Sequence, residues 1–146
     1  MIVRQFIKEK DFDDCIKTFI NVFNCPPWND EWTYEKAKEF LLDYINHPSF
    51  LGFVCEDEQI QKGYLLGYIF KWWDTHHYYI NEMFIKSLYK GQGIGKFLLN
   101  EVKKILRQKN IGSIMLLTMR NTQAEQFYLK NGFYYNECMI QMICDL

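Results

Sequence analysis

Three closely spaced glycines, Gly91, Gly93 and Gly95, mark the segment whose residue types point most directly to chemistry. The segment follows an apolar run typical of a strand and opens a run with helical periodicity. The first N–H groups of a helix lack partners and its dipole favours negative charge, so such a junction binds anions. Glycines also let the backbone approach a phosphate closely. The loop is therefore predicted to hold a phosphate-bearing ligand.

Two common phosphate-binding loops do not fit this spacing. A nucleotide-hydrolase loop has four residues between its glycines, followed by Lys and then Ser or Thr. Gly91 and Gly95 have three residues between them, and Phe97 follows Lys96. A dinucleotide fingerprint needs G-x-G-x-x-G and an acidic residue about twenty positions later. Here the loop reads G-x-G-x-G, and residues 111–117 contain no carboxylate.

A third kind of loop does fit. Lys90, Gly93 and Gly95 occupy the positions at which motif A of the GNAT superfamily, the acetyl-CoA-dependent N-acetyltransferases, has Gln or Arg, then Gly, then Gly or Ala. The lysine is a departure from the usual Gln or Arg, and it leaves the backbone cradle intact.

A second segment resembles the same family, in the family's order. Its motif B is an Asn that opens a helix ending in Phe-Tyr-x-x-x-Gly-Phe, and this chain reads Asn121-x-x-Ala124-x-x-Phe127-Tyr128-x-x-x-Gly132-Phe133. The resemblance covers roughly residues 50–140. It implies acetyl-CoA as co-substrate and no metal.

The resemblance also implies where the co-substrate lies. The glycine loop would take the pyrophosphate, and the pantetheine arm would pair with the backbone of the fourth strand. A bulge in that strand would leave N–H groups free to polarise the thioester. The predicted contacts are Met83, Phe84 and Ile85 on the strand, Lys90, Gly91, Gln92, Gly93, Ile94, Gly95 and Lys96 in the loop, and Asn121 and Tyr128 in motif B.

The reaction that the resemblance implies needs a base and an acid. An aliphatic amine titrates near ~10.4 and must lose a proton before it attacks, and a carboxylate is the natural acceptor. Glu82 is the candidate base, with an exposed strand carboxylate as the alternative. Some relatives carry their acidic residue at the position of Asn81. On a regular strand Asn81 and Glu82 face opposite ways, so Glu82 and a water held by Asn81 both stay open. Tyr128 is the candidate acid for the departing thiolate, with a core tyrosine as the alternative.

The segment between the first two expected helices is predicted to wall the acceptor site, as it does in the family. Its tryptophan rings and carboxylates would hold a cationic amine by cation–π and ion-pair contacts. The alternative is a proline turn whose tryptophans pack on the core. The predicted acceptor contacts are Trp28, Asp30, Glu31, Trp32 and Asn81.

The expected elements describe a mixed α/β domain over residues 1–146. A strand in residues 1–8 precedes a helix capped by Asp11, and Thr33 caps a second helix that ends before Pro48. Residues 49–85 read as three antiparallel strands. After the glycine loop come a helix, a strand at 113–119 covered on both faces, a helix capped by Thr122 and Glu125, and two further strands. The resemblance implies the GNAT fold: a mostly antiparallel sheet of six or seven strands, splayed between the fourth and fifth, with about four helices on both faces.

Composition limits the remaining function classes. The net charge of −1 argues against binding to nucleic acid by bulk charge. The five cysteines contain no C-x-x-C pair, so no structural zinc site is expected. His47, His76, His77, Trp72 and Trp73 are expected to face solvent. No signal peptide is expected, and the apolar run at 63–70 is too short to cross a membrane, which predicts a cytoplasmic protein.

The sequence thus predicts an N-acetyltransferase that moves an acetyl group from acetyl-CoA to a primary amine. The expected acceptor is a small cationic molecule, such as a polyamine, an aminoglycoside-like sugar or an amino-acid derivative. A protein lysine or N-terminal amine is the runner-up acceptor, and a non-catalytic acyl-CoA-binding sensor is the alternative from another class. No nucleic-acid or membrane partner is expected, and a homodimer is a family-level expectation.

Overall fold

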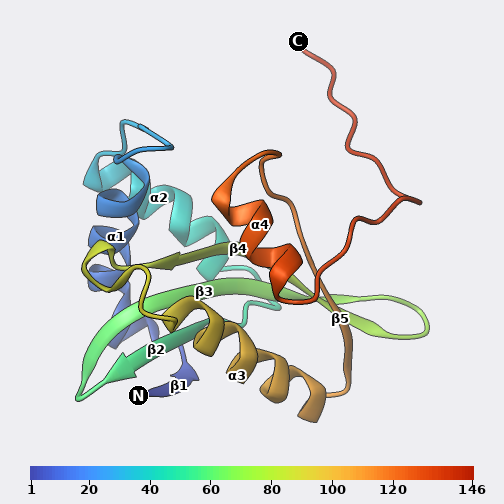
Figure 1. Cartoon of the computed structure of the whole chain (residues 1–146), viewed down its shortest axis with the longest axis horizontal. Helices are drawn as coiled ribbons and strands as arrows, with labels where there is room; N and C mark the ends of the chain where they lie inside the picture. Colours follow the sequence, from blue (N-terminus) through green and yellow to red (C-terminus); the bar gives the residue numbers. More distant parts are fainter. The chain divides into compact units, whose positions relative to one another are not determined.

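A five-stranded sheet in simple chain order organises the first part of the protein (Figure 1). The computed structural model describes all residues 1–146 and divides them into two units, residues 1–116 and 117–146, which we describe separately. Neighbouring strands from β1 to β4 run antiparallel, and β5 runs parallel to β4. The strands are β1 Ile2–Gln5, β2 Phe53–Asp57, β3 Ile60–Lys71, β4 His76–Ile85 and β5 Ile111–Leu116.

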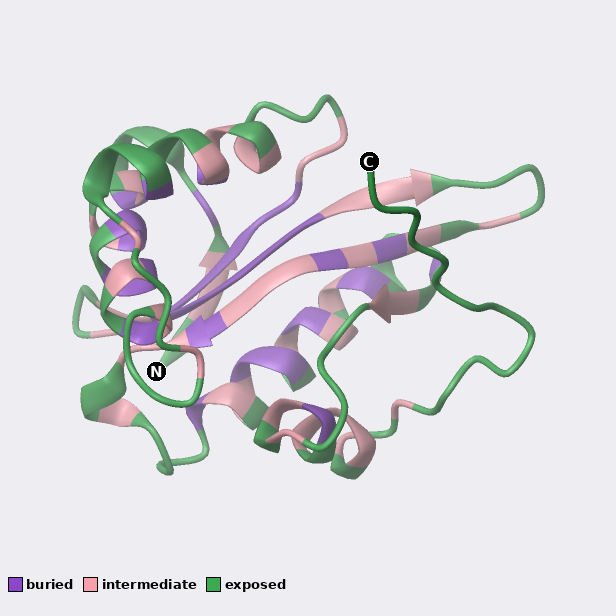
Figure 2. Ribbon diagram, turned by 90° about the horizontal axis from the view of Figure 1, so that it is seen from above, coloured by how far each residue is buried: buried purple, intermediate pink, exposed green.

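Helices cover both faces of this sheet (Figure 2). α1 (Lys8–Phe23) and α2 (Tyr34–Ile45) pack on one face, where their apolar sides enclose Tyr64, Leu66 and Phe84. We call this the α1–α2 face. On the other face, α3 (Ile94–Gln108) buries its own apolar stripe, and the short 3₁₀ helix η1 (Ser87–Tyr89) precedes it. The mixed α/β class and the placement of helices on both faces are confirmed.

The predicted start of α2 is confirmed, whereas the predicted start of α1 is wrong. Thr33 caps α2 as predicted, since its side chain accepts from the N–H of Lys36. Asp11 does not cap α1, which begins at Lys8 after Ile7. Asp11 is instead buried inside the first turn, where it accepts from the Ile7 N–H at 2.8 Å and from the Arg4 guanidinium in two bonds of 2.7 Å. The ion pair with Arg4 on β1 holds the carboxylate within the helix.

One extra residue interrupts the pairing of β3 with β4. Gly67 pairs with Ile80 and Leu66 pairs with Glu82, so Asn81 is a β-bulge. Residues two apart on a regular strand share a face, and an extra residue breaks this alternation. Ile80 and Glu82 therefore point to opposite faces. Glu82 lies on the α1–α2 face together with Phe84, whose ring contacts Phe19 there.

The fourth and fifth strands diverge, as the resemblance implies. Their pairing runs from His76↔Ile111 to Ile80↔Leu116, and residues 81–85 of β4 extend beyond it. The backbone groups of 81–85 on that side have no partner strand. The strand at 113–119 was expected to be covered on both faces, but β5 ends at Leu116 and only its first residue is buried. It is the edge strand of a sheet of five rather than six or seven.

The second unit contains α4 (Gln123–Lys130), whose two ends match the prediction. Thr122 accepts from the N–H of Glu125 at 3.2 Å, and the Glu125 carboxylate accepts from the N–H of Asn121 at 2.7 Å. At the other end Gly132 has φ 86, and the Phe133 N–H donates to the Tyr128 carbonyl. The two further strands expected after Phe133 are not formed, because residues 134–146 adopt no regular structure.

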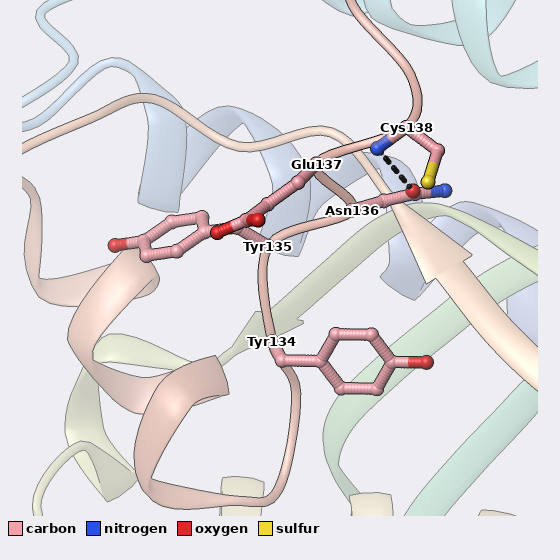
Figure 3. A pocket seen from close by; sticks show the side chains of 5 residues that line it. All are labelled: Tyr134, Tyr135, Asn136, Glu137 and Cys138. Carbon is pink, nitrogen blue, oxygen red and sulfur yellow. Dashed lines mark hydrogen bonds between the residues drawn. The ribbon is translucent and has the colours of Figure 1, made fainter.

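Within that C-terminal segment, residues 134–138 line an open hollow (Figure 3). The Cys138 N–H donates to the Asn136 side chain at 3.1 Å, and the Tyr135 hydroxyl donates to Glu125 at 3.0 Å. No helix of the chain combines the length and the apolar character that crossing a membrane requires.

Candidate active site

Glu82 lies half-buried on the α1–α2 face, in a group of residues drawn from four elements. It interacts electrostatically with Cys15 of α1, Tyr44 of α2, Tyr79 of β4 and Asp30 in the loop between the two helices. The group contains no cation, and Glu82 forms no ion pair. An uncompensated carboxylate in such surroundings favours its protonated form.

Burial, with a smaller contribution from the charge of Asp30, raises the pKa of Glu82 to about 7. Burial also raises the pKa of Tyr44 to about 12 and that of the Cys15 thiol well above its ordinary value. At neutral pH these two neighbours keep their protons, whereas Glu82 exchanges its proton readily. A general base works best when its pKa is close to the working pH. The geometry and charge of the site thus suit Glu82 to proton removal.

The loop between α1 and α2 brings one of its four predicted acceptor residues into electrostatic contact with Glu82. Trp32 packs on the core, with its ring 5.2 Å from Phe19, and its Nε1–H donates to Asp30 at 2.9 Å. Trp28 likewise packs on the core. Both tryptophans thus pack against aromatic residues of α1, and their contact with an acceptor stays a prediction. Trp32 holds Asp30 in place, while Glu31 is exposed.

The glycine loop has the geometry expected of an anion cradle. Gly91 and Gly93 adopt the left-handed conformation, with φ 78 and φ 79, and a Cβ built on either would meet no atom within 4 Å. Open space therefore adjoins the backbone at both glycines. Gly93 is the N-cap of α3 and provides no side-chain cap, in contrast to the threonines that cap α2 and α4. The first N–H groups of α3 are left for a ligand, so the phosphates of acetyl-CoA fit this loop.

The loop side chains divide into those available to a phosphate and those used elsewhere. Lys90 and Lys96 are exposed and form no ion pair. Ile94 is buried, so only its backbone can contact a ligand. The Gln92 side chain donates to the Leu88 carbonyl at 3.2 Å and stabilises the loop itself.

The strand residues predicted to line the pantetheine arm show a similar division. Phe84 is buried against α1 and offers only its backbone, while Met83 and Ile85 are half-buried. Asn81 is half-buried at the bulge. The bulge that the resemblance implies is present, two residues before Met83.

An anchor at the start of the glycine loop was not predicted from the sequence. Lys86, which follows β4, donates to Asp14 of α1 at 2.8 Å, and Asp14 also accepts from the Tyr64 hydroxyl at 2.5 Å. Lys62 lies over the ring of Tyr89 at 5.0 Å. These contacts join residues far apart in the sequence, so no local pattern could have indicated them. The same holds for Cys15, Tyr44 and Tyr79 around Glu82.

Asn121 and Tyr128 belong to the second unit. Asn121 has φ 61 and begins the turn into α4. Tyr128 is half-buried, with its ring 5.3 Å from Phe127 and 5.2 Å from Phe133. Their roles toward acetyl-CoA stay predictions. No group of three or more His, Cys, Asp and Glu side chains is arranged to hold a metal ion.

The family model described as the acetyltransferase (GNAT) family matches residues 13–133. The chain belongs to the GNAT acetyltransferase family. A search of curated protein sequences found no match to it.

Solved structures similar to this GNAT protein share its fold over nearly the whole chain. One is a possible acetyltransferase from Clostridium difficile 630, with a TM-score of 0.82 and 16% identity, covering 99% of this chain and 97% of that one. Another is an aminoglycoside acetyltransferase from an uncultured soil metagenomic sample in complex with sisomicin, with a TM-score of 0.76 and 19% identity, covering 99% and 95%. A GNAT family acetyltransferase from Staphylococcus aureus has a TM-score of 0.71 and 18% identity, covering 99% and 98%.

Proposed function

We propose that this GNAT protein is an N-acetyltransferase that moves an acetyl group from acetyl-CoA to a primary amine of a small cationic acceptor. The observation that carries the proposal is Glu82, a half-buried carboxylate with a pKa of about 7 and no cation beside it. Such a group can take a proton from an amine at neutral pH. Asp30 adds a second negative charge that attracts a cationic acceptor.

The chain's own residues would bind and orient both substrates. When bound, acetyl-CoA supplies an acetyl group activated as a thioester. The backbone of Gly91 and Gly93 and the first N–H groups of α3 would hold its phosphates, with Lys90 and Lys96 adding positive charge. The backbone of residues 81–85, which β5 leaves without a partner strand, would hold the pantetheine arm.

Two side chains are proposed to move the protons. Glu82 would accept the proton that the amine nitrogen releases as it attacks. Tyr128 is the proposed donor of a proton to the departing sulfur, as motif B implies, and Asn121 a proposed contact of the pantetheine arm. The acceptor enters beside Asp30, and Trp28, Glu31, Trp32 and Asn81 complete the proposed wall of its site.

Thiol release from acetyl-CoA with a panel of amines tests this proposal. The panel contains spermidine, sisomicin, free lysine and a lysine-containing peptide. Sisomicin is included because a structural neighbour holds it, and the peptide represents the alternative of a protein acceptor. Turnover with a small polycation supports the proposal, and turnover with the peptide alone supports the protein acceptor. Tight acetyl-CoA binding without any turnover supports the sensor.

A further inference from the structure

A row of aromatic side chains begins beside Glu82 and follows the β3–β4 hairpin toward its tip. Tyr68 pairs with Tyr79 and Phe70 pairs with His77 across the two strands. The bulge at Asn81 places Glu82 on the same face as these two pairs. Trp72 continues the row, its ring stacked 5.7 Å from Phe70. The aromatic row is defined as Tyr68, Phe70, Trp72, His77 and Tyr79.

The rings contact one another in pairs along the hairpin, and the Tyr68 ring also lies 4.5 Å from the His47 ring. Tyr68 and Tyr79 lie 5.6 Å apart, and Phe70 and His77 lie 6.3 Å apart. A strand rises about 3.3 Å per residue, and Leu66, the partner of Glu82, precedes Trp72 by six residues. The row therefore reaches about 20 Å from Glu82. This length corresponds to a molecule of two or three linked six-membered rings.

The row is solvent-accessible, and its tyrosine hydroxyls are unused, whereas the His77 Nδ1 hydrogen-bonds with the Ser113 hydroxyl at 2.6 Å. Its members on β3 and β4 are half-buried, and Trp72 is 54% exposed. The hydroxyls of Tyr68 and Tyr79, and that of Tyr44 beside Glu82, make no hydrogen bond within the protein. The hydroxyls of Tyr64 and Tyr78, by contrast, donate to Asp14 and to the Leu51 carbonyl. Apolar faces combined with free polar groups are typical of ligand sites.

The chemistry of the row selects among cationic amines. The row contains no carboxylate, so it would bind a ligand by ring contacts, and a linear polyamine has no ring to place on it. Its rings already contact one another at interplanar angles between 30° and 38°, which leaves no parallel pair to clamp a flat aromatic ring. A sugar ring needs only one aromatic face for its C–H groups, and its hydroxyls can bond to tyrosine hydroxyls.

We propose that the aromatic row is the acceptor-binding platform and that the acceptor is an amino sugar of two or more rings. Its reacting amine lies at Glu82 with a second ammonium group near Asp30, and its further rings lie on Tyr68, Tyr79 and then Phe70 and Trp72. This inference rests on the proposed acetyl transfer for its reacting end. The platform itself rests on the register and exposure of the hairpin.

The test compares two acceptors that differ by one ring: kanamycin B, with three rings, and neamine, which lacks the third. Trp72→Ala should raise the KM and the Kd for kanamycin B about tenfold, the size of one lost stacking contact. It should change both values for neamine less than twofold. Trp73→Ala is the matched control, because Trp73 is 87% exposed and contacts no ring of the row. It should leave both acceptors unchanged.

Calorimetry without acetyl-CoA gives a binding readout that does not depend on catalysis. If kanamycin B binds and Trp72→Ala weakens it, but no amine releases thiol, the platform stands and the proposed acetyl transfer fails. If spermidine or the lysine peptide is acetylated while kanamycin B neither binds nor reacts, the transfer stands and the platform is overturned. Equal effects of Trp72→Ala on kanamycin B and neamine, or none on either, would also overturn it.

Discussion

Replacing Glu82 with glutamine removes the charge of the side chain while keeping its shape, and the structure predicts opposite effects on stability and activity. Burial and Asp30 raise the pKa of Glu82 from 4.5 to about 7 in the folded protein. Between these pH values the folded chain holds a proton that the unfolded chain releases. The free energy of unfolding of the wild type should therefore fall as pH rises from about 4.5 to about 7, and stay level above that.

The size of this effect follows from the two pKa values. At 1.36 kcal/mol per pH unit, the difference between 4.5 and about 7 corresponds to about 3 kcal/mol. Because Glu82 is only half-buried, solvent screens part of this energy, and we expect about 2 kcal/mol. Glu82→Gln should then be more stable than the wild type by about 2 kcal/mol at pH 8 and nearly equal to it at pH 4.5. At this chain length that corresponds to a rise in Tm of about 4–8 °C.

Urea unfolding of both proteins between pH 4.5 and 8 measures the stability, with Glu31→Gln as an exposed control that should show no such trend. Activity should move the other way, because a lost general base costs about 10²-fold or more in kcat. The wild-type kcat/KM should fall tenfold per pH unit below about 7, and the variant should lack this limb. Parallel stability curves for the two proteins would refute the uncompensated burial of Glu82. A stabilised variant with full activity would refute its role as the base.

Changes at Gly93, Tyr128, Asp30 and Asn81 test the other parts of the site. Gly93→Val should abolish acetyl-CoA binding in a folded protein, measured by calorimetry, because its side chain would occupy the open space at the loop and strain a left-handed residue. Tyr128→Phe should lower kcat about 10²-fold with little change in acetyl-CoA affinity or Tm, and an equal loss of Tm would return Tyr128 to a packing role. Asp30→Asn should raise the acceptor KM, flatten its salt dependence and shift the acidic limb to lower pH, since Asp30 raises the pKa of Glu82, whereas Glu31→Gln should leave the acidic limb in place. Deletion of Asn81 keeps Ile80 and Glu82 on their present faces but removes the bulge, so it should cut kcat at least about tenfold. Asn81→Ala keeps the bulge and should change kcat less than about threefold. A larger loss for Asn81→Ala would indicate that the side chain holds a catalytic water.

Local signals predicted the parts of the fold that depend on local contacts. Thr33 and Thr122 begin helices because a hydroxyl three residues before a free N–H needs no tertiary partner. Gly132 ends α4 because its left-handed φ is accessible to glycine at little cost. The prediction that Asp11 caps α1 was wrong because it used only the residue type. The Asp11 carboxylate instead pairs with Arg4, which lies on another element.

The composition of the group around Glu82 could not be predicted in this way. Asp30 occupies its place because the Trp32 ring packs on Phe19 and its Nε1–H holds the carboxylate. Tyr44 and Tyr79 reach Glu82 from different elements. The loop was recognised as a candidate from its acidic and aromatic residues, but which of them faces the site depends on the packing of α1 against α2.

Gly67 allows β3 and β4 to lie close together beside the bulge that places Glu82 on the α1–α2 face, and the reason is steric. A Cβ on Gly67 would lie 2.2 Å from the Tyr79 carbonyl oxygen and 2.7 Å from the Tyr78 ring, so only glycine allows β4 to approach this closely. A glycine inside a strand is a recognised sign of a bulge or of close backbone contact. It stands opposite Ile80, next to the point where Asn81 is inserted. If Asn81 were paired regularly instead of bulged, Glu82 would lie on the same face as Ile80, away from Asp30 and from the aromatic row. Gly67 and the bulge at Asn81 thus lie side by side at the point of the hairpin from which Glu82 reaches the site.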